Sequence, residues 1–285
     1  MRGNIPPMLN ACEHSIRLYS ARKIAQLRAK PTGSVAVAAI AGRDSIAAII
    51  EALGTERDIS VIVPTSVGTG TEFGDLETVH EATEFLRDRI AALFPGRPLE
   101  LLTETRFGSE KLWAALNARF AAEIQRRFGM DSPCLACHLY VHLARVPLAL
   151  ALDSTVMISG ERDTHDGRIK LSQTADSIDA ETRVLKRAGI TLLNPLRTLS
   201  GTHIETLTPG WPEGARQLEC VHSGNFKLAD GTVAYDRADH LRYMEEFFEP
   251  AGNVVIDAWL GRDDAVRGED GVPSCDYQKL IQNIL

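Results

Sequence analysis

Three of the five cysteines stand where they could bind a metal ion or carry sulfur. Cys134 and Cys137 form a C-x-x-C pair directly after Pro133, at the start of a predicted helix, and Cys220 lies further along the chain. The positive end of the helix dipole favours the thiolate, which is the form that binds metals and attacks sulfur. Because five is an odd number, a disulfide framework explains the pattern poorly. The cysteines therefore indicate a metal site, a redox pair or sulfur chemistry.

Four chemistries are compatible with this pattern. The run Cys-x-x-Cys-His is the attachment motif of c-type haem, and two neighbouring thiols can form a redox dithiol. An iron–sulfur cluster held by three cysteines would leave one iron open to a sulfur atom of the substrate. A structural zinc ion would take the same three cysteines and one further ligand, which would be His138, His222 or Cys275. The residues themselves leave these alternatives open.

A second stretch, AIAGRDS at positions 39–45, joins an apolar run to a helical pattern. The free backbone N–H groups of a helix N-terminus bind anions, and Gly42 lets the backbone come close to a phosphate. Ser45 adds a hydroxyl donor, Arg43 adds positive charge, and Asp44 either caps the helix or holds a magnesium ion. The stretch predicts a phosphate site, with a simple tight turn as the alternative.

Short apolar runs alternate with helical patterns between residues 34 and 196. The predicted strands lie at 34–40, 58–64 (ended by Pro64), 99–104, 155–159 and 190–196. The predicted helices lie at 44–54, 75–94, 111–128, 134–146 (ended or kinked by Pro147) and 174–188. This alternation is typical of a parallel sheet with helices on both faces. We therefore expect a Rossmann-like sheet of five parallel strands that binds its ligands beyond the carboxyl ends of the strands.

The chain divides into three expected segments. Residues 1–30 contain a basic helical segment, residues 31–200 form the α/β domain with the predicted phosphate site, and residues 201–285 form an irregular extension with a helix at 239–248 and a strand at 253–259. A formal charge of −7 argues against a surface that binds nucleic acid throughout. No apolar run suits a membrane span or a secretory signal, so we expect a cytoplasmic protein without a membrane partner.

The AIAGRDS stretch resembles the Ser-Gly-Gly-x-Asp-Ser signature of the PP-loop ATP pyrophosphatases, a superfamily with a HUP-type α/β fold. Gly42, Asp44 and Ser45 match this signature, whereas Ile40 and Ala41 replace its first serine and first glycine. Enzymes of this superfamily cleave ATP between its α and β phosphates to adenylate a substrate. The resemblance implies that ATP and Mg²⁺ bind at Ala41, Gly42, Arg43, Asp44, Ser45, Ser159, Gly160 and Lys170. For Lys170, a solvated loop side chain is the alternative.

The cysteine pattern resembles that of the tRNA 2-thiolation enzymes within this superfamily, which carry Pro-Cys-x-x-Cys after the third helix and a third cysteine after the fifth strand. The resemblance implies a [4Fe–4S] cluster held by Cys134, Cys137 and Cys220, with Asp44, Cys134 and Cys137 as catalytic residues. A related branch uses two such cysteines as nucleophile and persulfide carrier. The implied activity is adenylation followed by transfer of sulfur from a donor to a tRNA base or a small molecule, and a homodimer is compatible with it.

Two other functions are compatible with the sequence. One is an adenylating amide ligase in which the cysteines hold a structural Zn²⁺ ion. The other is a non-catalytic module that senses a nucleotide or a metal, which the departures at Ile40 and Ala41 favour. Because the chain has no further C-x-x-C pair that could form a tRNA-gripping zinc finger, a small-molecule substrate stays open.

Overall fold

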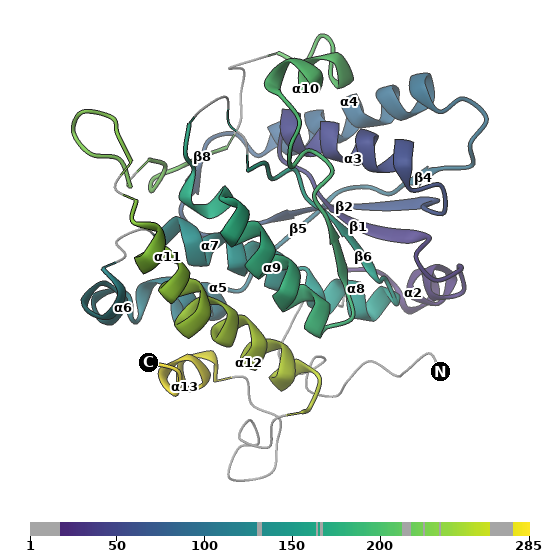
Figure 1. Ribbon diagram of the computed structural model, residues 1–285. Coiled ribbons are helices and arrows are strands. Elements are labelled where there is room, and N and C mark those ends of the chain that lie inside the picture. The colour runs from purple at the N-terminus through teal and green to yellow at the C-terminus, as the bar shows by residue number, and fades with distance from the viewer. Residues whose placement is uncertain are drawn as a thin grey trace.

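A parallel sheet organises the computed structural model of the chain (Figure 1). Its strands follow the order β4-β2-β1-β6-β7, with β5 also beside β2. The strands are β1 (Val35–Ala39), β2 (Val61–Val67), β4 (Glu100–Leu101), β5 (Thr105–Phe107), β6 (Val156–Ile158) and β7 (Thr191–Leu193). Strand β4 lies within the predicted third strand at 99–104, whereas β5 follows that range and was not predicted. The expected Rossmann-like parallel sheet is confirmed. The structure describes residues 18–129, 133–163, 165, 168–212, 218–224, 226–233, 235–262 and 276–285.

The second strand continues through Pro64 to Val67, so the prediction that this proline ends it is wrong. Pro64 lies opposite Ala38 in the register with β1. On the other side of β2, the carbonyl groups of Ser60 and Ile62 accept hydrogen bonds from β4 and the residue after it. On this side of β2, Pro64 lies opposite the gap between β4 and β5. The proline is tolerated because its missing N–H donor falls where the ladder is already interrupted.

Alternate residues of β1 enter two separate cores, one on each face of the sheet. Val35 and Val37 belong to the larger core, whereas Ala36 and Ala38 belong to the smaller one. The smaller core is covered by α3 (Arg43–Thr55), α4 (Glu77–Leu93) and α10 (Gly201–Leu207). The larger core is covered by α2 (Ala21–Arg28), α5 (Glu110–Trp113), α6 (Ala121–Phe128), α7 (Pro133–Leu143), α8 (Val146–Leu152), α9 (Ala175–Arg187), α11 (Arg237–Tyr243), α12 (Glu249–Trp259) and α13 (Tyr277–Gln282).

Two of the predicted helices are divided in the structure. The segment 111–128 forms α5, a π-helical turn over Ala114–Ala118 and then α6. The segment 134–146 forms α7, and Pro147 lies in the first turn of α8. That position suits a proline because the first N–H groups of a helix have no partner within it. The division was expected at Pro147 but not within 111–128.

Residues Pro133–Leu152 are long and apolar enough to cross a membrane, judged by length and composition alone. However, 78% of the most apolar window of this stretch is buried inside the protein. Leu139 and Leu143 have no exposed surface and belong to the larger core. The stretch is therefore a buried core element of a soluble-looking α/β protein.

The C-terminal extension is irregular between α10 and α11, as predicted, and then becomes helical. The predicted helix at 239–248 corresponds to α11 and a π-helical turn that follows it. The predicted strand at 253–259 is wrong, because these residues belong to α12. Val255, Ile256 and Trp259 are fully buried at helical spacing, so packing against the larger core overrides the β-branched composition.

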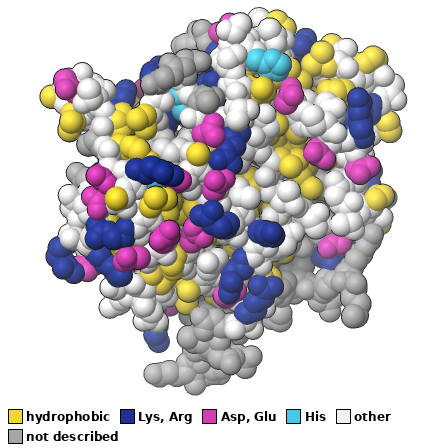
Figure 2. Space-filling model, viewed as in Figure 1, with side chains coloured by type: hydrophobic (Ala, Val, Ile, Leu, Met, Phe, Trp, Pro, Cys, Tyr) yellow, Lys and Arg dark blue, Asp and Glu magenta, His cyan; other side chains and the backbone are white. Residues whose placement is uncertain are grey.

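Three basic residues in and just after α2 contact other parts of the molecule. Lys23 lies 2.7 Å and Lys30 lies 3.9 Å from the carboxylate of Glu100 at the sheet edge. Arg28 donates a hydrogen bond of 3.1 Å to the carbonyl of Ala151. On the face that Figure 2 shows, basic and acidic side chains are interspersed. In this view the described surface has no large patch of a single charge sign.

His240 ties the C-terminal helices to the central domain. Its Nε2 atom lies 3.0 Å from Ser177 Oγ and 3.2 Å from Thr174 Oγ1, which is the N-cap of α9. The pKa of His240 is lowered to about 4, mainly by burial. The charge of Asp176 opposes this shift, and the charge of Arg237 adds to it. The folded protein therefore holds this imidazole neutral at neutral pH.

We predict that His240 makes the protein less stable in mild acid. Below pH 6.5 the unfolded chain gains a proton that the folded chain does not take up until about pH 4, so stability is full above pH 6.5 and falls toward pH 4. Between pH 7 and pH 5 this group should cost about 1–2 kcal/mol. Urea unfolding followed by circular dichroism should show a smaller loss in His240→Gln than in the wild type. Equal losses in both proteins would contradict the prediction.

Candidate functional site

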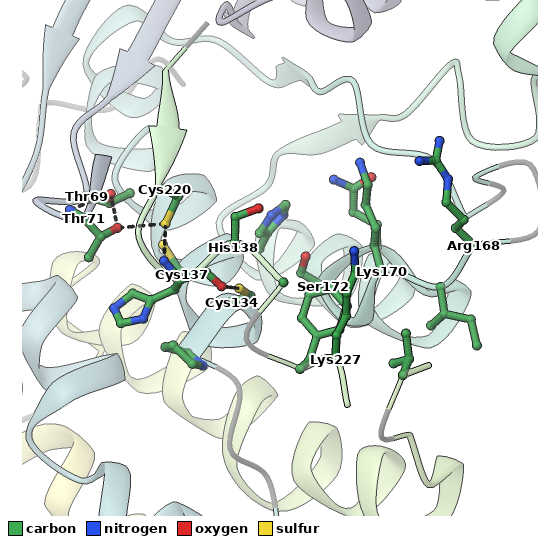
Figure 3. Close-up of a pocket in the computed structure, with 18 of the residues that line it drawn as sticks. Thr69, Thr71, Cys134, Cys137, His138, Arg168, Lys170, Ser172, Cys220 and Lys227 are labelled. Atoms are coloured by element: carbon green, nitrogen blue, oxygen red, sulfur yellow. Dashed lines mark hydrogen bonds between the residues drawn. The ribbon is translucent and has the colours of Figure 1, made fainter. Parts of the chain in front are cut away.

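The three predicted cysteine ligands come together in one pocket of about 870 Å³ (Figure 3). Cys134 and Cys137 lie at the start of α7, and Cys220 lies on the short strand β8 (Glu219–Cys220). The backbone of His222 contacts two of the sulfurs: its carbonyl accepts from Cys134 Sγ at 3.5 Å, and its N–H donates to Cys220 Sγ at 3.4 Å. No disulfide joins any of the three to another described residue. Cys12 and Cys275 lie outside the described residues.

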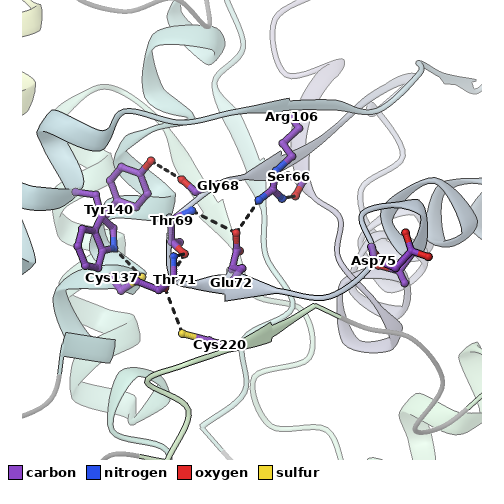
Figure 4. Close-up of polar contacts among 12 residues, drawn as sticks. Ser66, Gly68, Thr69, Thr71, Glu72, Asp75, Arg106, Cys137, Tyr140 and Cys220 are labelled. Atoms are coloured by element: carbon purple, nitrogen blue, oxygen red, sulfur yellow. Dashed lines mark hydrogen bonds and ion pairs between the residues drawn. The ribbon is translucent and has the colours of Figure 1, made fainter.

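Cys220 is brought to the other two cysteines by a strand pairing that the sequence analysis did not predict. Strand β8 pairs antiparallel with β3 (Glu72–Phe73), which follows the carboxyl end of β2 (Figure 4). Glu72 lies opposite Cys220 in this register, and Thr71 Oγ1 lies 3.3 Å from Cys220 Sγ. The loop after β2 therefore sets the position of the third cysteine.

Polar contacts hold that loop in place. The Tyr140 hydroxyl donates to the carbonyl of Gly68 at 2.8 Å and accepts the N–H of Ser109 at 2.8 Å. Arg106 forms a 2.7 Å ion pair with Glu72. Figure 4 shows these contacts around the loop. Because Tyr140 belongs to the same helix as the C-x-x-C pair, α7 both carries two cysteines and fixes the loop that positions the third.

The surroundings of Cys137 favour its protonated form. Trp113 Nε1 donates a hydrogen bond of 3.4 Å to its sulfur. Burial raises the pKa of Cys137 to about 12, with further raising by Cys220 and Cys134 and an opposing effect of the Trp113 hydrogen bond. The sulfur therefore carries a proton at neutral pH unless a metal replaces it.

We predict that Cys137 reacts slowly with iodoacetamide in the metal-free folded protein. A pKa of about 12 instead of 9.0 leaves about a thousandth of the usual thiolate at pH 8, so alkylation should be more than about tenfold slower than for a free thiol. Mass spectrometry of the labelled peptide should show a rate that still rises above pH 10. In urea the same site should level off near its ordinary pKa. A folded-state rate that levels off near pH 9 would contradict the prediction.

A second pocket, of about 520 Å³, lies at the carboxyl ends of β1 and β6. These strands are neighbours in the sheet although they are far apart in sequence, and the strand order switches between them. Such a switch point is where open α/β sheets bind ligands. All the residues predicted to contact the nucleotide line this pocket: Ala41, Gly42, Arg43, Asp44, Ser45, Ser159, Gly160 and Lys170.

Ser45 organises the loop that leads into α3. Its hydroxyl accepts hydrogen bonds from the N–H groups of Ala41 at 2.9 Å and Gly42 at 3.0 Å, and it donates to the Gly42 carbonyl at 2.7 Å. The Asp44 carboxylate lies 3.4 Å from Arg162. Ile40, which departs from the PP-loop signature, is buried in the smaller core. The departure at Ile40 therefore adds core packing and takes a hydroxyl away from the loop.

Gly160 allows the turn after β6 to touch the loop after β1. A Cβ atom at this position would lie 2.7 Å from the carbonyl carbon of Asp44 and 2.8 Å from the nitrogen of Ser45. Contacts below 3.0 Å with backbone atoms are not tolerated, so the two turns can approach this closely only with glycine at position 160.

We predict that Gly160→Ala weakens ATP binding by at least about tenfold, or about 1.4 kcal/mol, because it displaces the loop at the N-terminus of α3. Isothermal titration with a nonhydrolysable ATP analogue measures the effect. Gly54→Ala is the matched control on α3, because a Cβ there meets nothing within 4 Å, and it should bind as the wild type does. Equal affinities in all three proteins would show that ATP does not bind at this loop.

Arg162 is a pocket residue that the sequence analysis missed. Its side chain is almost fully buried, and neither its Nε nor its Nη1 atom has a hydrogen-bond partner among the described residues. Burial lowers the pKa of nearby Lys170, with Asp44 opposing and Arg162 adding to the effect. Its position two residues after Gly160 was the available signal. The pocket therefore holds cationic groups that suit a polyanion such as a phosphate chain.

The two pockets share a wall. His138, Val141, Arg168, Lys170 and Gln173 line both of them. The predicted nucleotide residues and the three cysteines are therefore on opposite sides of the same few side chains.

A buried charged cluster lies against this wall. Glu161 contacts His138 Nδ1 at 2.8 Å and His142 Nε2 at 3.1 Å, and Glu181 lies 3.4 Å from His142. Burial alone would lower the pKa of His142, but Glu161 and Glu181 raise it to about 10. Burial and then the charge of Glu161 raise the pKa of Glu181 to about 7. The sequence analysis did not predict this cluster.

No family model matches the sequence. The chain is 33% identical over 227 residues to a protein of Methanocaldococcus jannaschii that carries the name "Uncharacterized protein MJ0009". The aligned region covers 78% of this chain and 79% of the archaeal protein.

Proposed function

The chain belongs to the same family as protein MJ0009 of Methanocaldococcus jannaschii, whose name states no activity, and we propose from its own pockets that it is an ATP-dependent adenylating sulfur transferase of PP-loop type. One observation carries the proposal: the cysteine pocket and the second pocket share a wall formed by His138, Val141, Arg168, Lys170 and Gln173. A sulfur transferase needs an activated substrate next to its sulfur. The shared wall supplies that proximity.

The nucleotide pocket supplies the activation step. The N-terminus of the 13-residue helix α3 binds the phosphates of ATP, and Asp44 provides a carboxylate for the accompanying Mg²⁺ ion. A carbonyl oxygen of the substrate attacks the α-phosphorus, and the bond to the β-phosphate bridge breaks. Arg162 and Lys170 stabilise the negative charge that develops on the departing pyrophosphate. The substrate then carries AMP as a good leaving group.

The cysteine pocket supplies the sulfur step. Cys134, Cys137 and Cys220 fit a [4Fe–4S] cluster because three partly exposed cysteine side chains from two segments line one pocket. When bound, the cluster would supply an open iron that holds sulfur. Trp113 orients the Cys137 sulfur through its hydrogen bond, and the His222 backbone fixes the sulfurs of Cys134 and Cys220. An external donor delivers sulfur at the sulfide level, as HS⁻, and its lone pair attacks the activated carbon. The bond from that carbon to the AMP oxygen breaks, AMP leaves with the electron pair, and the sulfur loses its proton as the C=S bond forms.

The substrate is a carbonyl-bearing base of tRNA or a small molecule. A pocket of about 870 Å³ has room for a group of either kind. The net charge of −7 and the use of Lys23 and Lys30 in pairs with Glu100 favour the small molecule. We place the reaction in the cytoplasm, where thiols stay reduced.

The first test is anaerobic purification followed by an absorption spectrum and analysis of iron, sulfide and zinc. We predict a brown protein with a band near about 400 nm and about four iron atoms per chain. Cys134→Ala, Cys137→Ala and Cys220→Ala should each lose the band, whereas Cys12→Ala, the control, should keep it. Asp44→Asn should keep the colour but lose at least about 90% of ATP-dependent pyrophosphate release, because a neutral amide holds Mg²⁺ poorly.

Other outcomes point to the rival functions. A colourless protein with one zinc ion and pyrophosphate release that needs an amine would support an adenylating amide ligase. ATP binding without pyrophosphate release would support a sensing module. A colourless, metal-free protein that still transfers sulfur would support a persulfide relay through Cys134 and Cys137. Circular dichroism of every variant separates these outcomes from a failure to fold.

A further inference from the structure

Three ligand-type side chains from three separate elements meet below the wall between the pockets. His138 comes from α7, Glu161 follows β6, and Glu181 comes from α9. One ligand atom from each residue can be chosen so that all three lie within 4.8 Å of one another. Glu161 and Glu181 are buried, whereas His138 is partly exposed.

Glu181 lacks the hydrogen bonds that a buried carboxylate needs. It has no exposed surface, and neither of its side-chain oxygens has a hydrogen-bond partner among the described residues. Its ion-pair contact within the described chain is His142 Nε2 at 3.4 Å. Burying a carboxylate in this way is costly unless a counter-charge lies against it. The second carboxylate, Glu161, increases the need for positive charge.

We propose that His138, Glu161 and Glu181 bind one divalent metal ion, at a site distinct from the three cysteines and from the magnesium ion of ATP. One imidazole and two carboxylates suit Zn²⁺, Mn²⁺ or Fe²⁺. Three protein ligands leave a further coordination position open, as in metal sites that act on a substrate. The proposal does not rest on sulfur transfer, because it follows from these three residues alone.

His142 acts as a positioning residue for this site. Its Nε2 atom lies 3.1 Å from both oxygens of Glu161 and 3.4 Å from Glu181, so one N–H group orients both carboxylates. Outer contacts of this kind commonly orient metal-binding carboxylates.

Through its ligand His138, the ion would be close to molecules bound in either pocket. This residue lines both pockets, and it is the partly exposed member of the three. An ion held here would therefore lie next to a side chain that both pockets share. There it would polarise a carbonyl or phosphoryl oxygen of a bound molecule as a Lewis acid.

The test uses the full chain with all five cysteines replaced (C12S, C134S, C137S, C220S and C275S), so that thiolates cannot bind the probe. Co²⁺ is added to metal-free protein. We expect one ion per chain, visible d–d bands between about 500 and 650 nm, and no thiolate charge-transfer band. Zn²⁺ should displace Co²⁺ and raise the melting temperature.

Glu181→Gln in the same background should weaken Co²⁺ binding at least tenfold, because it removes a charged ligand with little change of shape. Glu205→Gln is the matched control, since Glu205 is exposed on α10 and should leave the affinity unchanged. Equal affinity in Glu181→Gln, or a spectrum identical to that of free Co²⁺, would overturn the proposal. The His142 imidazolium would then be the counter-charge for the two carboxylates.

A second readout covers the case in which a variant does not fold. Mn²⁺ prefers carboxylate and imidazole to thiolate, so it can be added to the chain with its cysteines intact. Its electron paramagnetic resonance signal should fall on binding, with one site per chain in the absence of ATP. An unchanged Mn²⁺ signal in a folded protein that also gives no Co²⁺ bands would overturn the proposal. Loss of the iron colour in the cysteine variants bears only on the sulfur transferase.

Discussion

The close approach of Gly160 to the backbone of Asp44 and Ser45 is the contact on which the rest of the site depends. It brings together two turns that are more than a hundred residues apart in sequence, at the point where the strand order switches. Parallel pairing of β1 with β6 sets the level of the two turns, and the absent Cβ lets them touch. The nucleotide pocket is therefore built on the two most central strands. Its geometry is a consequence of sheet register rather than of flexible loops.

Several buried charged residues lie against the wall between the two pockets. Glu161, Glu181, His142 and Arg145 are all nearly inaccessible to solvent. Arg145 uses its guanidinium within the fold, donating to Thr65 at 2.9 Å and to a carbonyl of α7. Charged groups in such surroundings cost folding free energy unless they are paired. Glu161 and Arg145 have hydrogen-bond partners, whereas neither oxygen of Glu181 has one among the described residues. The region that separates the two pockets thus also contains buried charged side chains.

The sequence predicted the parts of this protein that follow from local pattern. The apolar runs that became β1, β6 and β7 are short and bounded, and polar side chains just after buried strands mark a ligand edge. The β3–β8 pairing escaped prediction because two-residue strands carry no periodicity. Glu181 escaped because a charged residue in an amphipathic helix is usually expected to face solvent, whereas Glu181 is buried and lies against His142 of α7. The helix α12 was predicted as a strand because Val254, Val255 and Ile256 have high strand propensity.

The two halves of the site differ in how firmly they are held. The nucleotide half stands on central strands with fully buried neighbours, whereas Cys220 depends on a two-residue pairing whose flanking side chains are open to solvent. Phe73 is 51% exposed and Val221 is 67% exposed. Segments with few buried contacts open at low free-energy cost. A metal that binds all three cysteines would therefore stabilise β8 more than any other element, since it links this strand directly to α7. On this argument the cysteine pocket reaches its final geometry only when the proposed metal binds, whereas the fold alone forms the proposed nucleotide pocket.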